Sequence, residues 1–250
     1  MSFLKRLFGG GAGPRFDTPV APDGPVFVIG DLHGCKIQLD TLLGQMAAKD
    51  ATAMRIFVGD YVDRGEDSAG VLRALFAMKD DPSVILLIGN HEDMMLGFLD
   101  DPAQKGQRWL RYGGLQTLAS FGIGGVTASS EGDALVTAST ALKDAMGADM
   151  LAWLRTLPAT WTSGNLTVLH AGADPVTPLV LQSAKTFMWG HPDFDRVLRT
   201  DGTWVAHGHT VVEHANADGG KIAVDTGAYA TGKLTAAYVT SGDVSFVQTR

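Results

Sequence analysis

Polar residues that can bind metal ions follow five short apolar stretches of the sequence. A single residue of this kind at a strand end is usually a turn former or a helix cap. Several together indicate one shared site, because oxygen and imidazole donors in combination suit divalent transition metals such as manganese, iron or zinc. The group comprises Asp31, His33, Asp60, Asn90, His170 and a histidine of the segment 207–209.

Asp60 is the residue best suited to bridge two metal ions. One carboxylate can bind two metals about 3.5–4 Å apart, the separation used by two-metal hydrolases. Such a pair lowers the pKa of a shared water and neutralises charge on a phosphoryl group, so an acidic protein can bind phosphate. Glycines that allow sharp turns and close backbone approach flank the polar residues, at Gly30, Gly34, Gly59, Gly65 and Gly89.

Strand and helix patterns alternate along the chain and must position these residues. Apolar, β-branched stretches predict strands at 26–29, 55–58, 84–88, 166–169, 204–206 and 222–224, with a closing hairpin over 234–239 and 244–248. Helical spacing of apolar residues separates the first three. The pattern is typical of an α/β protein whose sheet is buried on both faces and is at least partly parallel. In such sheets ligands bind at the carboxyl ends of the strands, where the polar residues lie.

The chain reads as one domain with a tail and an insertion. We expect a flexible N-terminal tail over 1–24, a domain over 25–250, and a helical insertion over about 97–158. Phe3, Leu4, Leu7 and Phe8 could line one face of a short helix, so a weak contact with a membrane surface or a partner is the alternative to a frayed tail.

Composition excludes several other classes of protein. The 250 residues are 45% hydrophobic and 19% charged, which is ordinary for a globular protein. A formal net charge of -7 gives no overall attraction for a nucleic-acid polymer. No apolar run reaches the roughly 18 residues of a transmembrane helix. The single cysteine, Cys35, excludes an intrachain disulfide framework and favours a cytoplasmic location. The oligomeric state is left open.

Five motifs occur in a fixed order, each after a predicted strand: GDLHG, GDYVDRG, GNHE, HAG and GHT. With these motifs the sequence resembles the phosphoprotein phosphatase branch of the calcineurin-like metallophosphoesterases, over roughly residues 26–239. The resemblance implies a four-layer α/β/β/α sandwich and two divalent metal ions, Mn²⁺ first, with iron or zinc as alternatives. It implies that Asp31 and His33 hold the first metal, that Asp60 bridges, and that Asn90, His170 and His209 hold the second.

The resemblance also implies catalytic roles. His91 matches the general acid that protonates the leaving oxygen, Asp63 the carboxylate that orients it, and Arg64 the arginine that grips phosphate. The implied mechanism is direct attack of a metal-bridging hydroxide on phosphorus. His207, by contrast, is expected to be a packed histidine or one that supports a ligand without touching the metal.

One position departs from the family pattern. Bacterial relatives usually carry Trp-x-Arg after the HAG strand, and that arginine is a second phosphate clamp. Here His191 stands at the position of the arginine, two residues after Trp189. The candidates for the missing contact are His191 itself, Arg196, Arg108 and Arg111.

Three functions remain open. The first is a bacterial-type serine/threonine protein phosphatase, and the alternative is a symmetrical bis(5'-nucleosyl)-tetraphosphatase. The expected partner is accordingly a phosphorylated protein or a phosphorylated small molecule or nucleotide. The third is a non-catalytic scaffold of the same fold, which the presence of His91, Asp63 and all six ligands disfavours.

Overall fold

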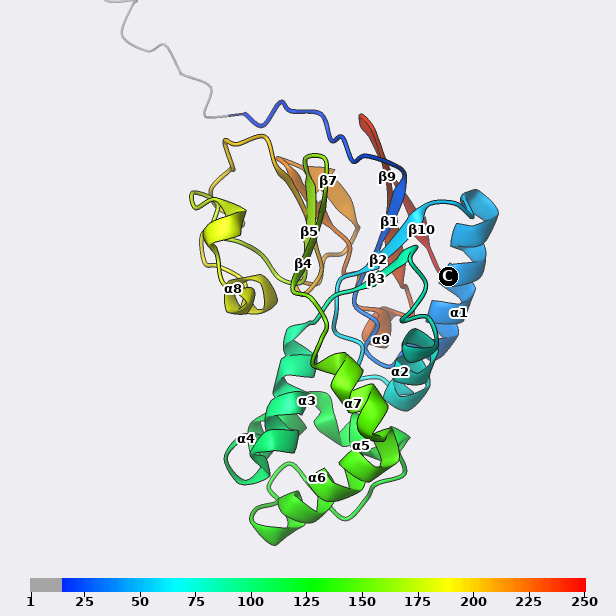
Figure 1. Ribbon diagram of the computed structural model, residues 1–250, viewed down its shortest axis with the longest axis vertical. Helices are drawn as coiled ribbons and strands as arrows, with labels where there is room; N and C mark the ends of the chain where they lie inside the picture. Colours follow the sequence, from blue (N-terminus) through cyan, green and yellow to red (C-terminus); the bar gives the residue numbers. More distant parts are fainter. Residues whose placement is uncertain (1–14) are drawn as a thin grey trace, which may run out of the picture.

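Two five-stranded sheets form the centre of the computed structural model, which describes residues 15–250 (Figure 1). The first sheet has parallel strands β1 (Val26–Ile29), β2 (Met54–Phe57) and β3 (Val84–Leu86), continued by antiparallel β9 (Thr235–Thr240) and β10 (Asp243–Gln248). The second has parallel strands β5 (Leu166–Leu169), β6 (Trp204–His207) and β8 (Lys221–Ala223), with antiparallel β4 (Thr160–Ser163) and β7 (Asn216–Asp218) at its edges.

Alternation of side chains along the apolar strands produces four layers. Val26 and Val28 of β1 point into a core shared with the second sheet, whereas Phe27 and Ile29 pack on the helical side. Helices α1 (Lys36–Lys49) and α2 (Ser68–Ala77) cover the outer face of the first sheet, and α8 (Ala184–Trp189) lies on the outer side of the second (Figure 1). The fold is the expected α/β/β/α sandwich.

The helical insertion lies between β3 and β4, and it begins a little earlier than the sequence suggests. It contains α3 (Asn90–Asp100), α4 (Pro102–Trp109), a π-helical turn (Leu110–Gly114), α5 (Leu115–Ser120), α6 (Asp133–Met146) and α7 (Ala148–Leu154). Its buried residues, including Phe98 and Trp109, belong to the same apolar cluster as Phe27 and Phe57 of the first sheet. The insertion is therefore part of the domain core.

The N-terminal segment from residue 16 onward packs against the second sheet and the last hairpin. Asn165 accepts a hydrogen bond from the Ala21 N–H at 2.6 Å, and the Trp204 indole N–H donates to the Thr18 carbonyl at 2.8 Å. Val20 is buried. The sequence predicted a flexible tail up to residue 24, but residues 16–24 are packed against the domain. Residues 1–14, including the possible amphipathic face, lie outside the described residues.

Two strands were not expected from the sequence. β4 and β7 are edge strands, and β7 is exposed along its length. Both lack the continuous apolar pattern because an edge strand buries less of its surface and polar residues there discourage pairing with another chain. Among residues 15–250, none of the helices has both the length and the apolar character needed to cross a membrane.

Candidate active site

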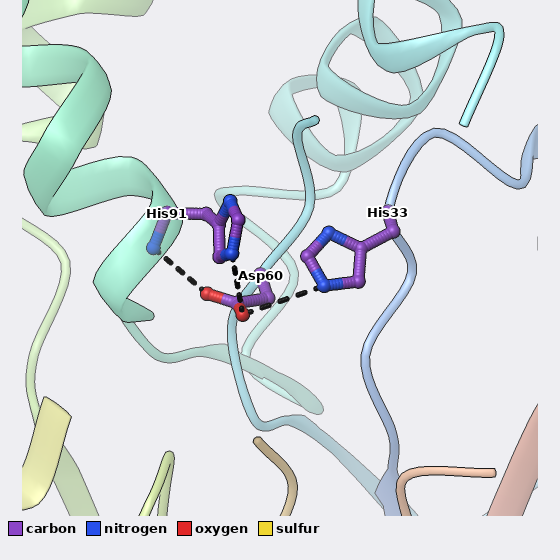
Figure 2. Close-up of side chains that lie close together, drawn as sticks. All are labelled: His33, Asp60 and His91. Atoms are coloured by element: carbon purple, nitrogen blue, oxygen red, sulfur yellow. Dashed lines mark hydrogen bonds and ion pairs between the residues drawn. The ribbon is translucent and has the colours of Figure 1, made fainter. Parts of the chain in front are cut away.

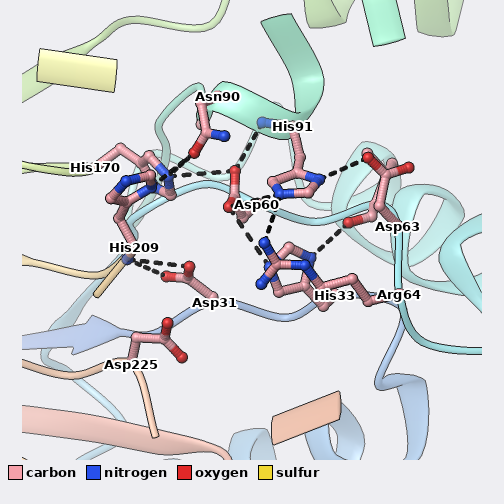
Figure 3. Close-up of polar contacts among 12 residues, drawn as sticks. Asp31, His33, Asp60, Asp63, Arg64, Asn90, His91, His170, His209 and Asp225 are labelled. Atoms are coloured by element: carbon pink, nitrogen blue, oxygen red, sulfur yellow. Dashed lines mark hydrogen bonds and ion pairs between the residues drawn. The ribbon is translucent and has the colours of Figure 1, made fainter. Parts of the chain in front are cut away.

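The carboxyl ends of five parallel strands from both sheets converge on one place, and each delivers a side chain there (Figure 3). The residues follow β1, β2, β3, β5 and β6 in turn: Asp31 with His33, Asp60, Asn90, His170 and His209. The structure thus brings together all six side chains singled out as metal ligands.

Asp60 lies between two groups of potential ligands. In one group, the ligand atoms of His33, Asp60 and His91 lie within 4.8 Å of one another (Figure 2), and in the other the same holds for Asp60, His170 and His209. His33 Nε2 is 3.5 Å from Asp60 Oδ2, whereas His170 Nε2 is 3.3 Å from Asp60 Oδ1. The two carboxylate oxygens therefore serve different groups, as a bridging ligand requires.

Asn90 joins the group of His170 and His209, and Asp31 lies beside His209. Asn90 Oδ1 lies 2.8 Å from both His170 Nε2 and His209 Nδ1, so three donor atoms converge on one side of Asp60. Asp31 lies on the other side of His209 and accepts its backbone N–H at 3.1 Å. This contact joins the GDLHG and GHT segments.

The donor set fits cations. His33 Nε2 is buried and has no hydrogen-bond partner among the described residues. Burial, together with the charges of Asp225 and Asp60, raises the pKa of Asp31 well above its ordinary value. An imidazole nitrogen without a partner and crowded buried carboxylates are costly unless a cation balances them. Two divalent metal ions would supply that balance.

The backbone of the site is held in an uncommon conformation. Among the described residues, the non-glycine residues with positive φ are His33, Asp60, Asp63, Arg64 and His209, with values from 40° to 73°. Such a conformation is unfavourable for residues with a side chain and persists only where the surroundings impose it. All five belong to the candidate site. The fold therefore holds these residues in an unfavourable backbone conformation that directs their side chains into the site.

Two motif glycines are required by close approach to the ligands. A Cβ atom at Gly89 would lie 2.2 Å from Asp60 Oδ1, and one at Gly208 would lie 1.9 Å from Asp31 Oδ1. No larger residue fits at either place without displacing a carboxylate. The glycines of GNHE and GHT are therefore needed because the absence of a side chain leaves room for the carboxylates of Asp60 and Asp31.

His91 lies between Asp60, Asp63 and Arg64 (Figure 3). Its Nδ1 is 2.6 Å from Asp63 Oδ2, and its Nε2 is 3.9 Å from Asp60 Oδ2. Burial lowers the pKa of His91, but the charges of Asp60 and Asp63 outweigh it, so the net shift is upward. Arg64 Nη2 lies 3.0 Å from Nε2 and, being always a donor, makes that nitrogen an acceptor in this arrangement.

Two residues of the helical insertion hold the Asp63 carboxylate, and sequence reasoning did not assign them this role. The Trp109 indole N–H donates to Asp63 at 3.0 Å, and the Thr117 hydroxyl donates to its other oxygen at 2.7 Å. Both side chains are fully buried. Nothing in their spacing predicts this contact, because they are more than 40 residues from Asp63 and reach it through the packing of the insertion.

Arg64 has a further neighbour that sequence reasoning missed. Its guanidinium carbon lies 5.0 Å from the centre of the Tyr229 ring, which also makes a T-shaped contact with the His33 ring. Tyr229 belongs to α9 (Ala228–Thr231). A guanidinium held over an aromatic face is partly preorganised, which suits a phosphate-binding arginine.

Glu92 organises the backbone around Asp60 without entering the ligand set. Its carboxylate accepts hydrogen bonds from four backbone N–H groups, those of Asp60, Tyr61, Val62 and Gly89, at 2.7–3.2 Å. These contacts account for the complete burial of Glu92. The carboxylate thereby ties the GDYVDRG loop to the start of α3.

We therefore expect Glu92→Gln to lower both stability and metal affinity. A carboxamide keeps one acceptor oxygen and would direct an NH₂ group at backbone N–H groups, and each unsatisfied buried donor costs about 1–3 kcal/mol. The melting temperature should fall by roughly 5–10 °C, since 1 kcal/mol corresponds to about 2–4 °C in a chain of this size. Thermal unfolding and Mn²⁺ titration would measure both effects. Glu66→Gln, at an exposed position of the same loop, is the matched control; an equal effect of both variants would contradict this role.

Asp225, which no sequence argument assigned, also enters the site. It lies two residues after the end of β8, directly after Val224, and is 1% exposed. Its Oδ1 accepts the Gly227 N–H at 2.8 Å, but Oδ2 has no partner among the described residues. The sequence feature that could have identified Asp225 as a site residue is its position directly after the predicted strand 222–224.

The candidates for a second phosphate clamp are differently placed. Arg108 lies over the Trp189 ring at 4.9 Å, and Trp189 in turn donates to Asp93. Arg111 contacts Gln107, while His191 caps its own loop by accepting the Asp193 N–H. Arg196 is exposed, and within residues 15–250 no hydrogen bond or ion pair joins its side chain to the site. His207 packs on Phe194.

These features place the chain in a known family of hydrolases. A family model described as calcineurin-like phosphoesterase matches residues 24–213, and the chain belongs to this family. The solved structure of a putative diadenosine tetraphosphatase has the same fold, with a TM-score of 0.63 and 22% identity over 93% of this chain and 99% of that one.

Curated relatives fall into two groups. A symmetrical bis(5'-nucleosyl)-tetraphosphatase of Ralstonia nicotianae is 30% identical over 259 residues, which covers 86% of this chain and 89% of that protein. Serine/threonine-protein phosphatase 2 of Salmonella typhimurium is 37% identical over 89 residues, and the match spans 36% of this chain and 38% of that protein. The relatives thus share a phosphatase class and differ in substrate.

Proposed function

We propose that this chain hydrolyses phosphate esters or anhydrides with the aid of two divalent metal ions. The carrying observation is the position of Asp60, whose two oxygens face separate histidine groups beside the Asp63–His91–Arg64 cluster. The metals would be held by Asp31, His33, Asp60, Asn90, His170 and His209. When bound, they supply an acidified water and neutralise negative charge on the phosphoryl group. Mn²⁺ is the first candidate, followed by iron and zinc.

Arg64 and His91 share the work on the substrate side. Arg64 can leave His91 Nε2 to donate two parallel hydrogen bonds to phosphate oxygens. That movement frees Nε2 to hold a proton, which the nearby carboxylates of Asp60 and Asp63 favour. His91 then donates this proton to the leaving oxygen, and Asp63 keeps the ring oriented through Nδ1. Phosphate binding by Arg64 thus allows His91 Nε2 to carry the proton that the general acid donates.

For the substrate we favour a dinucleoside tetraphosphate, because of a cavity along α3, the helix that begins at Asn90. A cavity of about 450 Å³ is lined by α3 residues that share the helix face of Asn90, namely Asp93, Met94, Gly97 and Asp100. The other lining residues are Ile88, Leu96, Lys105, Arg108, Arg155 and Trp189. Arg155 is ion-paired with Asp100, which leaves Lys105 and Arg108 against Asp93, so the cavity keeps a small positive charge in a chain of net charge -7. Cations beside an aromatic ring suit a nucleoside phosphate.

A phosphoprotein is the second candidate substrate. The similarity to serine/threonine-protein phosphatase 2 favours it, and that match is confined to 36% of the chain. The tetraphosphatase relative is similar over 86% of the chain. The motifs do not separate the two substrates, and we place the dinucleotide first on the longer match and the cavity.

Turnover by a metal-stripped and Mn²⁺-reconstituted sample tests this proposal. The substrates are p-nitrophenyl phosphate, a phosphoserine/phosphothreonine peptide and diadenosine tetraphosphate. We expect no turnover without metal, and with metal a preference for the dinucleotide with ADP as the product. Preference for the peptide would establish the phosphoprotein alternative. Absence of turnover on all three with two metals bound would overturn the enzyme proposal and favour the scaffold.

A further inference from the structure

We infer that Asp225 is an additional oxygen donor to the first metal ion, beside Asp31 and His33. This inference rests on the proposed two-metal function and adds a ligand that none of the five motifs contains. Asp225 occupies the same kind of position as the other ligands, because it follows a buried strand of the second sheet at its carboxyl end.

The packing of two strand ends sets Asp225 beside Asp31. The backbone of Gly30 lies so close to that of Val224 that a Cβ at Gly30 would be 2.4 Å from the Val224 carbonyl oxygen. Each of these residues is followed directly by an aspartate. Figure 3 shows the Asp225 side chain next to that of Asp31, on the side away from His91. The loop after GHT closes over this place, since the Val212 N–H donates to the Asp225 carbonyl at 2.9 Å.

The Asp225 side chain has one oxygen in use and one free. Oδ1 accepts the Gly227 N–H and so fixes the turn that leads into α9. Oδ2 is buried and has no partner among the described residues. A purely structural aspartate would have both oxygens hydrogen-bonded or exposed to water, because a buried polar atom without a partner is costly. A metal ion is a partner that would satisfy Oδ2.

The charge balance of the site supports the same conclusion. In the described part of the chain, neither Asp31 nor Asp225 forms an ion pair with lysine or arginine. With Asp60, three buried carboxylates therefore crowd the first metal position. The second position has Asn90 and two histidines in addition to Asp60. A first site rich in carboxylates favours a harder ion such as Mn²⁺ over zinc.

The test is Mn²⁺ binding to metal-stripped Asp225→Asn, measured by calorimetry, with thermal unfolding recorded with and without metal. The variant keeps the acceptor for the Gly227 N–H and removes the charge. We expect one of the two sites to weaken by tenfold or more while the other is unchanged. Without metal the melting temperature should stay the same or rise, because carboxylate repulsion is relieved, and the gain on adding Mn²⁺ should shrink.

Control variants separate the possible failures. Asp31→Asn should weaken the same site, and Asp149→Asn, an exposed carboxylate on α7, should change neither affinity. Parental affinities at both sites in Asp225→Asn would overturn the inference, as would a lower metal-free melting temperature with an unchanged gain on adding Mn²⁺. Asp225→Ser, which also keeps an acceptor for Gly227, repeats the test if the asparagine variant folds poorly. If the parent itself bound fewer than two ions, the proposed function would fail instead.

Discussion

Replacing His91 by glutamine should reduce kcat on phenyl phosphate by about 10²–10⁴-fold, the usual contribution of a general acid. The loss should be much smaller on 2,4-dinitrophenyl phosphate, whose leaving oxygen needs no proton. This difference follows from the position of His91, whose Nδ1 is fixed by Asp63 at 2.6 Å and whose Nε2 points to the Asp60 side of the site. Steady-state kinetics over a series of leaving groups measures it.

Variants at Thr117 provide the matched comparison for His91. Thr117→Val removes a hydrogen bond to Asp63 without changing the volume much, so it should show the same leaving-group dependence in weaker form. Thr117→Ser keeps the hydroxyl and should restore most of the parental rate on phenyl phosphate. An equal loss on both substrates in His91→Gln would show that His91 does not donate the proton.

Replacing Asp60 by asparagine should abolish binding of a metal pair and lower kcat by about 10³-fold or more. Metal charge stabilisation is worth several kcal/mol in the transition state, and each 1.36 kcal/mol is tenfold in rate. An asparagine offers one oxygen where Asp60 presents two to opposite histidine groups, and Asp60 Oδ1 also accepts the His91 backbone N–H at 2.9 Å.

Metal content by mass spectrometry after dialysis, together with turnover of p-nitrophenyl phosphate, tests the Asp60 variant. Asp149→Asn serves again as the control, because it removes the same charge from an exposed helix. Retention of two tightly bound ions by Asp60→Asn would contradict the bridging role.

Most strands could be predicted from the sequence, because strands of a sheet covered on both faces are continuously apolar. β1, β5 and β9 are buried along most of their length, whereas the edge strand β10 could be predicted as the second strand of a hairpin. The edge strands β4 and β7 escaped prediction since their polar residues leave no period-two or continuous apolar signal. The N-terminal segment escaped for a related reason: its contacts are backbone bonds to Asn165 and to the last hairpin, which composition does not encode.

The sequence by itself determined which side chains end each buried strand, and so it indicated Asp31, Asp60, Asn90 and the histidines of the two groups. Strand ends are local features, and parallel strands bring their carboxyl ends to one edge whatever the details of packing. Because five such strand ends meet in one fold, most residues of the site follow from the strand pattern.

Only the tertiary structure decided what supports and completes that set. Trp109 and Thr117 reach Asp63 from the insertion, Tyr229 lies under Arg64, and Asp225 meets Asp31 through the contact of Gly30 with Val224. These approaches join residues that are far apart in sequence, so no local pattern records them. They arise because close packing allows one arrangement of the insertion and of the two sheets. The same arrangement holds His33, Asp60, Asp63, Arg64 and His209 in the left-handed backbone conformation.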